Sequence, residues 1–253
     1  MARDAVRLGK WHLRFAPVPL AATLGAALVF AALGYWQLDR AAQKRALEAV
    51  YRERAAAAPL DLNAALAPCA DGRADWRRVV AEGRWAPARQ VILDNSVMHG
   101  RVGYEVFTLL ALAGSKRGVL VDRGWVPAPA YRSVAPVVTL EASVAIVHGI
   151  AAPVPFSGLG AQADPDTSLG PQLLRVERVD LGVLGAALGT PLLDCTIRLD
   201  AAAPAGYARE WRAPGLDPAR HVAYALQWFA FAAIAVGIYL LLHVERRRGT
   251  APG

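Results

Sequence analysis

The sequence predicts an α+β protein in which two transmembrane helices flank a mostly antiparallel β-sheet, or small barrel, outside the membrane. Three observations predict this fold. Two runs of 24 residues without a charged side chain, residues 15–38 and 221–244, lie near the two ends of the chain. The segment between them alternates short β-type runs with turn signals. The formal charge of +7 is concentrated beside the apolar runs.

Each apolar run is long enough to cross a bilayer. At 1.5 Å per residue, 24 residues exceed a hydrocarbon core of about 30 Å. Aromatic residues typical of membrane interfaces flank both runs, namely Trp11, Tyr35 and Trp36 at the first and Tyr224, Trp228 and Tyr239 at the second. A cleaved signal peptide is the alternative for the first run, but the run is too long and no clean cleavage site precedes the charged segment. Small residues, Gly25 and Ala233-x-x-x-Gly237, suggest a helix–helix contact.

The charge distribution indicates a membrane partner and not nucleic acid. Residues 1–14 carry +3, residues 39–54 carry +2 and residues 245–253 carry +2, whereas the rest of the chain holds 16 basic and 16 acidic residues. Because the long middle region has little influence on topology, the two short basic tails decide the orientation. We expect both termini in the cytoplasm, the neutral middle in the periplasm, and a bacterial inner membrane as the location.

The chain between the spans is expected to form one α+β domain. The helical pattern continues past Leu38 and ends before Pro59. The β-type runs are 76–84, 90–94, 103–112, 118–126, 143–150, 173–179 and 192–199, and a short helix capped by Asp180 extends to about Leu188. Asp217 and Pro218 mark the start of the second span. The predicted segments are a cytoplasmic tail (1–14), the first span (15–38), its helical extension (39–58), the periplasmic domain (59–217), the second span (218–244) and a second cytoplasmic tail (245–253).

The two cysteines, Cys69 and Cys195, lie in the outer region, where a disulfide is permitted. Their spacing matches no metal-binding pattern, so a free or structural thiol pair is the simplest interpretation. His99 and His148 have no cysteine or carboxylate at metal-ligand spacing and are expected to be structural. No nucleophile–base set, zinc motif or phosphate loop is found, so an enzyme is not expected.

Four clusters stand out in the order in which they occur. They are residues 34–40 (GYWQLDR) with Lys44, residues 94–95 (DN) with 100–104 (GRVGY), residues 119–127 (VLVDRGWVP), and residues 221–228 (HVAYALQW). Each alone has an ordinary explanation. Trp36 and Arg40 fit a membrane interface, Arg123 fits a strand end with a buried neighbouring tryptophan, and His221 fits an interfacial residue that bonds a loop carbonyl.

Together, the GxWQxxR…K, RGW(V/I)P and HxxYAxQW patterns resemble the surfeit locus family of cytochrome c oxidase assembly factors, also known by the yeast name Shy. The resemblance covers nearly the whole chain, including the two spans. Two positions depart from the pattern: Asp122 stands where many members have Asn, and Gln227 occupies a variable site.

The resemblance implies a role in the assembly of haem-copper oxidase, with haem a as cofactor, subunit I as partner and haem a synthase as a further partner. His221 is then the candidate ligand of the haem iron, and Trp36, Arg40 and Arg123 are weaker candidates for the pocket. A carrier of haem a needs an apolar slot, a neutral imidazole and groups that bind propionates. Tyr224 and Trp228 share a helix face with His221, at i+3 and i+7, and are expected to line the macrocycle. The alternative is a scaffold that stabilises oxidase subunits without a cofactor.

Overall fold

The computed structural model describes residues 5–8, 11–14, 16–155, 161–211 and 217–246. The chain forms two compact units, one of residues 1–49 together with 214–253, and one of residues 50–213. The first contains the apolar runs and the second contains the sheet. Phe15, where the first run begins, and residues 156–160 and 247–253, predicted as loop and tail, lie outside the described residues.

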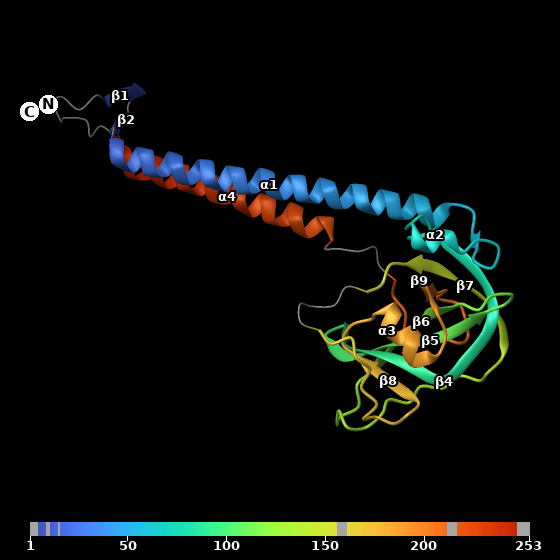
Figure 1. Ribbon diagram of the computed structural model, residues 1–253. Helices are drawn as coiled ribbons and strands as arrows, with labels where there is room; N and C mark the ends of the chain where they lie inside the picture. The colour runs from blue at the N-terminus through green and yellow to red at the C-terminus, as the bar shows by residue number, and fades with distance from the viewer. Residues whose placement is uncertain (1–4, 9–10, 15, 156–160, 212–216, 247–253) are drawn as a thin grey trace, which may run out of the picture. The chain divides into compact units, whose positions relative to one another are not determined.

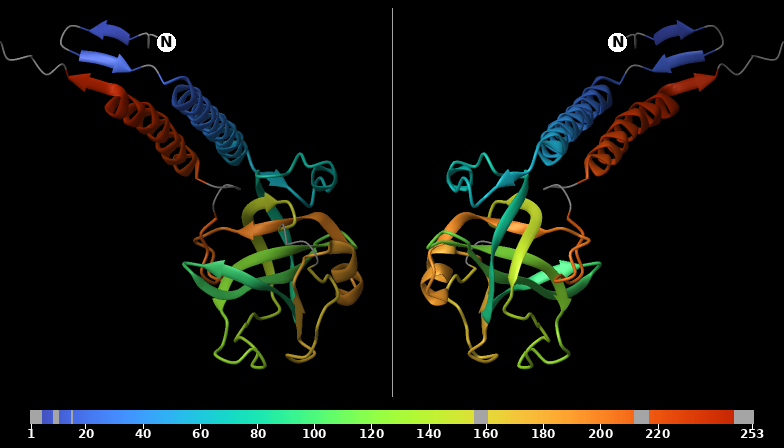
Figure 2. Two further views of the ribbon diagram at one scale, coloured as in Figure 1. Left: turned by 90° about the vertical axis from the view of Figure 1, so that its left-hand side faces the viewer. Right: turned by 90° about the vertical axis from the view of Figure 1, so that its right-hand side faces the viewer.

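Two long helices make up most of the first unit. They are α1 (Pro17–Ala56) and α4 (Pro218–His243), and they lie side by side (Figures 1 and 2). Both are long and apolar enough to cross a membrane, and only 6% and 11% of their most apolar windows are buried. A core helix of a soluble protein is mostly covered, so this exposure is compatible with membrane anchoring.

The ends of these helices follow from local chemistry. The Asp217 side chain accepts a hydrogen bond from the backbone N–H of Ala219 at 2.8 Å, and Pro218 occupies the first helical position, as expected. Helix α1 is continuous from Pro17 to Ala56, so it includes most of the residues predicted as a helical extension. Its last residues, from Val50 onward, belong to the second unit.

The described parts of the two tails form strands that the sequence analysis did not assign. Strand β2 (Trp11–Arg14) pairs with β1 (Ala5–Leu8) and with β10 (Val244–Arg246), in both cases antiparallel. Strands of three or four residues carry too short an alternation to be recognised from the sequence.

The second unit contains a seven-stranded sheet and two short helices. The elements are β3 (Leu60–Asp61), α2 (Ala67–Ala70), β4 (Arg78–Met98), β5 (Arg101–Leu112), β6 (Gly118–Pro127), β7 (Val144–Ala152), β8 (Leu173–Val176), α3 (Leu181–Leu188) and β9 (Leu192–Leu199). The strand order is β3-β4-β5-β6-β9-β7, and β4 also pairs with β7 and β8.

The prediction of a mostly antiparallel sheet was wrong, because the sheet is mixed. Strand β6 pairs with β9 in parallel, and β4 pairs with both β3 and β8 in parallel. The β4–β5–β6 hairpins and the β7 pairings are antiparallel. Strand β4 pairs with β7 at one end and with β5 along the rest, so the series of paired strands begins and ends at β4, but the sheet is not a clear barrel. The alternation of side chains along a strand does not show whether its neighbours run parallel or antiparallel, so the sequence could not predict the parallel pairs.

One long strand replaces two of the predicted ones. The runs 76–84 and 90–94 both belong to β4, whose pairing with β5 shifts register between Ala86 and Gln90. Pro87 lies in this interval and lacks the N–H that a regular ladder requires, so the strand bends and continues. Figure 1 shows β4 as the long curved strand of the globular unit.

The connection from β4 to β5 is a tight two-residue turn. His99 and Gly100 have φ angles of 50° and 75°, so both central residues are in the left-handed region. This is the pattern of a type I′ hairpin, whose twist matches that of the strands.

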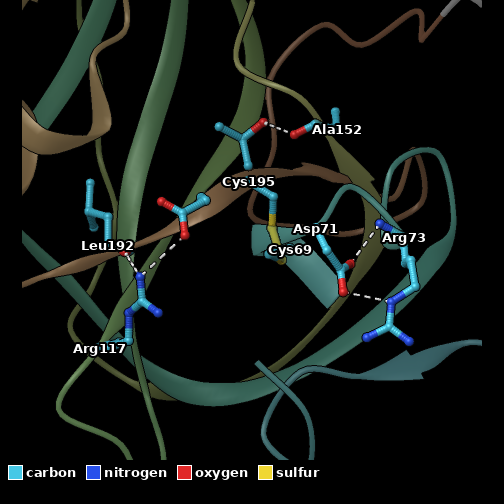
Figure 3. The surroundings of a disulfide bond; sticks show 9 residues. Cys69, Asp71, Arg73, Arg117, Ala152, Leu192 and Cys195 are labelled. Atoms are coloured by element: carbon cyan, nitrogen blue, oxygen red, sulfur yellow. Dashed lines mark hydrogen bonds and ion pairs between the residues drawn. A yellow bond between two sulfur atoms is a disulfide. The ribbon is translucent and has the colours of Figure 1, made fainter. Parts of the chain in front are cut away.

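A disulfide joins Cys69 on α2 to Cys195 on β9, with Cα atoms 5.2 Å apart (Figure 3). The sequence predicts no pairing for these cysteines, because a contact between residues 126 positions apart has no local signal. Both lie in a core cluster with Trp85, Leu110 and Val119.

Helix α3 packs through Leu184 against a second core cluster, which includes Val91 and Leu93 from the second half of β4. Asp180 caps α3 as predicted, accepting hydrogen bonds from the N–H groups of residues 182 and 183.

Candidate functional site

The candidate site is built on the seam between α1 and α4. Phe30 stacks on Trp228 with ring centroids 5.8 Å apart, and Tyr35 meets Phe229 edge-on at 5.3 Å. Residue numbers rise on one helix as they fall on the other, so the helices are antiparallel. Along α1, positions 30, 34, 37 and 41 share one face, at the i, i+4, i+7 spacing of helix packing.

Small residues let the two helices approach closely. Gly34, Ala41 and Ala225 are buried. A Cβ on Gly34 would lie 2.6 Å from an atom of the Phe229 ring, so this position has no room for a side chain. The glycines expected at the contact play no such part, because a Cβ on Gly25 or Gly237 would meet nothing within 4 Å.

One polar pair crosses this apolar seam. The Nδ1 atom of His221 lies 2.7 Å from the amide oxygen Oε1 of Gln37, across 184 residues of sequence. An amide oxygen only accepts hydrogen bonds, so Nδ1 carries the proton and donates it. The other ring nitrogen, Nε2, then presents a lone pair. It is buried and has no hydrogen-bond partner among the described residues.

The remaining residues predicted for the site in these helices have different environments. Trp228 packs in the seam against Phe30 and Phe231. Tyr224 and Trp36 are 55% and 54% exposed, so both rings are open to their surroundings. Arg40 is partly buried and donates a hydrogen bond at 2.7 Å to Gln43, one turn further along α1.

Arg123 belongs to the other unit, where it is only 2% exposed. Its guanidinium donates to four acceptors: the carbonyl of Ala205 at 2.6 Å, Oε1 of Gln90 at 2.9 Å, the carbonyl of Thr139 at 2.8 Å and Oγ1 of Thr108 at 3.3 Å. It also lies over the ring of Tyr207, 4.8 Å from the centroid. Burial lowers the pKa of this guanidinium, but an arginine stays protonated in proteins. This environment favours a structural role for Arg123 over a place in a ligand pocket.

The residues after Arg123 complete the same structural centre. Gly124 has a φ of 105°, and a Cβ there would lie 2.5 Å from the carbonyl oxygen of Ala208, so only glycine fits. Trp125 donates from its backbone N–H to the same carbonyl at 2.8 Å and from its indole to the carbonyl of Ser96 at 3.1 Å. The RGW sequence therefore fastens β6 to the chain around residues 205–208 and to the end of β4.

A buried carboxyl precedes Arg123. Asp122 is 2% exposed, and one of its oxygens accepts a hydrogen bond from the N–H of Gly124 at 3.0 Å. Burial, and then the nearby charge of Glu105, raise the pKa of Asp122 well above its usual value. Burial also raises the pKa of Glu105, although Arg198 opposes this rise. The residues that the structure describes contain no group of three or more His, Cys, Asp or Glu side chains able to hold a metal ion.

Comparison with known proteins identifies the relatives of this chain. The model of the SURF1 family matches residues 24–233. The chain belongs to the SURF1 family. SURF1-like proteins of Mycobacterium bovis and of two strains of Mycobacterium tuberculosis are 29% identical to it over 259 residues, covering all of this chain and 92% of each relative. SURF1 proteins are known generally as cytochrome oxidase assembly factors. The family and the general role in oxidase assembly, both predicted from the sequence motifs, are therefore confirmed.

Gln37, which lies within the residues matched by the SURF1 family, was not among the predicted site residues. It lies inside the GYWQLDR cluster, but only Trp36 and Arg40 of that cluster were singled out as candidates. A signal was present, because Gln37 is a polar side chain inside an otherwise apolar run and shares the i, i+4, i+7 face with Phe30 and Gly34. An ionisable or amide side chain at such a position is usually paired across helices.

Proposed function

We propose that this protein is a membrane-anchored, non-enzymatic assembly factor that holds haem a for subunit I of a haem-copper cytochrome c oxidase. His221 is the ligand of the haem iron in this proposal. The observation that carries it is the buried Nε2 of His221, which has no partner within the described chain while Nδ1 is held by Gln37. Four other buried side-chain atoms of the described chain also lack a partner, on Arg77, Tyr104, Arg209 and Tyr239. His221 differs from them because its unpartnered atom is an imidazole nitrogen, for which a role as iron ligand supplies the missing partner.

The residues present fit haem a in their donor chemistry. A neutral imidazole is the commonest protein ligand of haem iron, and the ring orientation here leaves its Nε2 lone pair free. The seam around it is apolar and aromatic, with Phe30 and Trp228 about two turns away along their helices. Because Nε2 is covered in this structure, the atoms over it must move when iron binds. The exposed rings of Tyr224 and Trp36 supply apolar surface for the macrocycle, and Arg40 supplies a cation for a propionate.

We also propose that α1 and α4 cross a bacterial inner membrane with both termini in the cytoplasm and residues 59–217 in the periplasm. Two observations support this orientation. Both tails are basic, as the positive-inside rule requires for cytoplasmic segments. The Cys69–Cys195 disulfide belongs to the unit assigned to the periplasm, and disulfides persist in oxidising compartments.

A cofactor-free scaffold for oxidase subunits is the second candidate. One observation favours it: the seam between α1 and α4 is already filled by Phe30, Trp228 and Phe229, with Nε2 covered. In that case the His221–Gln37 hydrogen bond only fixes the register of the two helices.

The visible spectrum of the purified protein separates the two candidates. Expressed in a host that makes haem a, the wild-type protein is expected to show a Soret band, and His221→Ala to shift or lose it. A colourless wild-type preparation that still co-purifies with subunit I supports the scaffold. Deletion of the gene is expected to lower oxidase activity in either case, and unchanged activity and oxidase spectra would contradict both.

A further inference from the structure

The hydrogen bond between Gln37 and His221 joins the two apolar helices at a fixed register. Gln37 comes from α1 and His221 from the first turn of α4, and the distance between Oε1 and Nδ1 is 2.7 Å. The neighbouring contacts hold this register, since Phe30 stacks on Trp228 and Phe229 fits against Gly34. The packing of the two helices therefore places Gln37 opposite His221.

We propose that Gln37 is a positioning residue for the iron ligand. This inference rests on the proposed function, because it assigns Gln37 a role only if His221 binds haem iron. By accepting the Nδ1 proton, Gln37 selects the tautomer in which Nε2 is the free nitrogen, and it fixes the plane of the imidazole. Without an acceptor at this place, the proton is free to reside on Nε2, and that tautomer cannot ligate iron through Nε2.

The chemical nature of Gln37 suits its surroundings. Histidines that bind metals usually donate their second N–H to a carboxylate or a carbonyl, and this bond raises the electron donation of the ring. In an apolar helix pair, a charged acceptor is costly, whereas an amide oxygen provides the same acceptor without a charge. Gln37 thus supplies the supporting hydrogen bond at low cost in membrane surroundings.

The test uses the full-length protein in detergent micelles, titrated with ferric haem a. Gln37→Met keeps the length of the side chain and removes the strong acceptor. We expect it to weaken haem binding by about 10- to 100-fold, the range found for such supporting partners, and to raise the midpoint potential of the bound haem. Gln37→Glu retains an acceptor and is expected to restore binding. Gln227→Met is the matched control, because Gln227 is an exposed glutamine on α4. We expect this variant to bind haem with the affinity and midpoint potential of the wild type.

The outcomes separate this inference from the proposed function. If His221→Ala keeps the wild-type spectrum and affinity, the proposed function fails and the role of Gln37 fails with it. If His221→Ala loses haem but Gln37→Met binds with wild-type affinity and potential, only the positioning role is overturned. If Gln37→Met does not fold, the potential of Gln37→Glu decides: an ionised acceptor is expected to lower it, and an unchanged potential overturns the inference.

Discussion

Each unit of this SURF1 protein contains a polar side chain from one of the sequence motifs, Arg123 in the globular unit and His221 in the helix pair, and the two differ in how fully their hydrogen bonds are satisfied. In the globular unit, Arg123 has four hydrogen-bond acceptors and an aromatic ring, so its bonding capacity is largely used within the fold. In the helix pair, His221 has one partner, Gln37, and one buried nitrogen without any among the described residues. The motif patterns alone do not distinguish these roles, but the hydrogen bonds that each side chain makes do. Four other buried side-chain atoms lack a partner in the described chain, on Arg77, Tyr104, Arg209 and Tyr239. Among these residues, only His221 combines an unpartnered nitrogen with the imidazole that commonly binds haem iron.

The largest effect on folding is expected at Arg123. Arg123→Gln removes the guanidinium and leaves the carbonyls of Ala205 and Thr139 without their donor in the interior. We expect the free energy of unfolding of the globular unit to fall by about 3 kcal/mol or more. Urea unfolding of the full-length protein, followed by tryptophan fluorescence, measures this. The control is Arg84→Gln, an exposed arginine on β4, which is expected to change stability by about 0.5 kcal/mol at most. Equal effects at both positions would contradict the structural role of Arg123.

The disulfide is expected to contribute next. Cys69→Ala combined with Cys195→Ala opens a loop of 126 residues, which increases the conformational freedom of the unfolded chain. We expect a loss of about 2–4 kcal/mol in the globular unit. A reducing agent should destabilise the wild type by a similar amount and leave the double variant unchanged. A wild type that is insensitive to reduction would show that this bridge does not stabilise the fold.

The elements of the fold differ in how much of their structure the sequence predicts. The caps Asp180 and Asp217, the helical pattern past Leu38 and the β-type runs in β5 and β6 were predicted because their signals lie within a few residues. The parallel pairing of β6 with β9 and the disulfide connect segments far apart in the chain, and no local pattern encodes them. For the candidate site, His221 and Trp228 were predicted, but their α1 partners Gln37 and Phe30 depend on the register of helix packing.

The helix seam is expected to be sensitive at Gly34. Gly34→Leu places a side chain where the Phe229 ring lies, and we expect the helix pair to lose about 1–3 kcal/mol of packing free energy. Hydrogen exchange of α1 and α4 in a bilayer mimic should become faster. Gly25→Leu is a matched control on the same helix, since a Cβ there has nothing within 4 Å. Similar exchange in both variants would contradict the packing described for the seam.

The smallest effect concerns the charge of Asp122. Its pKa is raised in the folded protein, so the folded state binds more protons than the unfolded state between the two pKa values. Stability is therefore fully present below the unfolded pKa of about 3.9 and decreases as the pH rises through the folded value. Asp122→Asn keeps an oxygen for the N–H of Gly124 and removes this cost. We expect it to stabilise the protein by on the order of 1 kcal/mol at pH 8 and to have little effect near pH 4. Unfolding curves at both pH values check this, and a benefit that is equal at pH 4 and pH 8 would argue against titration of Asp122.

The central claim is that the free nitrogen of His221 is the position where haem iron binds. His221→Gly removes the imidazole from the full-length protein, and free imidazole added to the solution can take its place. We predict that the variant loses the wild-type Soret band of bound haem a and regains it when imidazole is added. A variant that shows the wild-type spectrum without imidazole would contradict the claim.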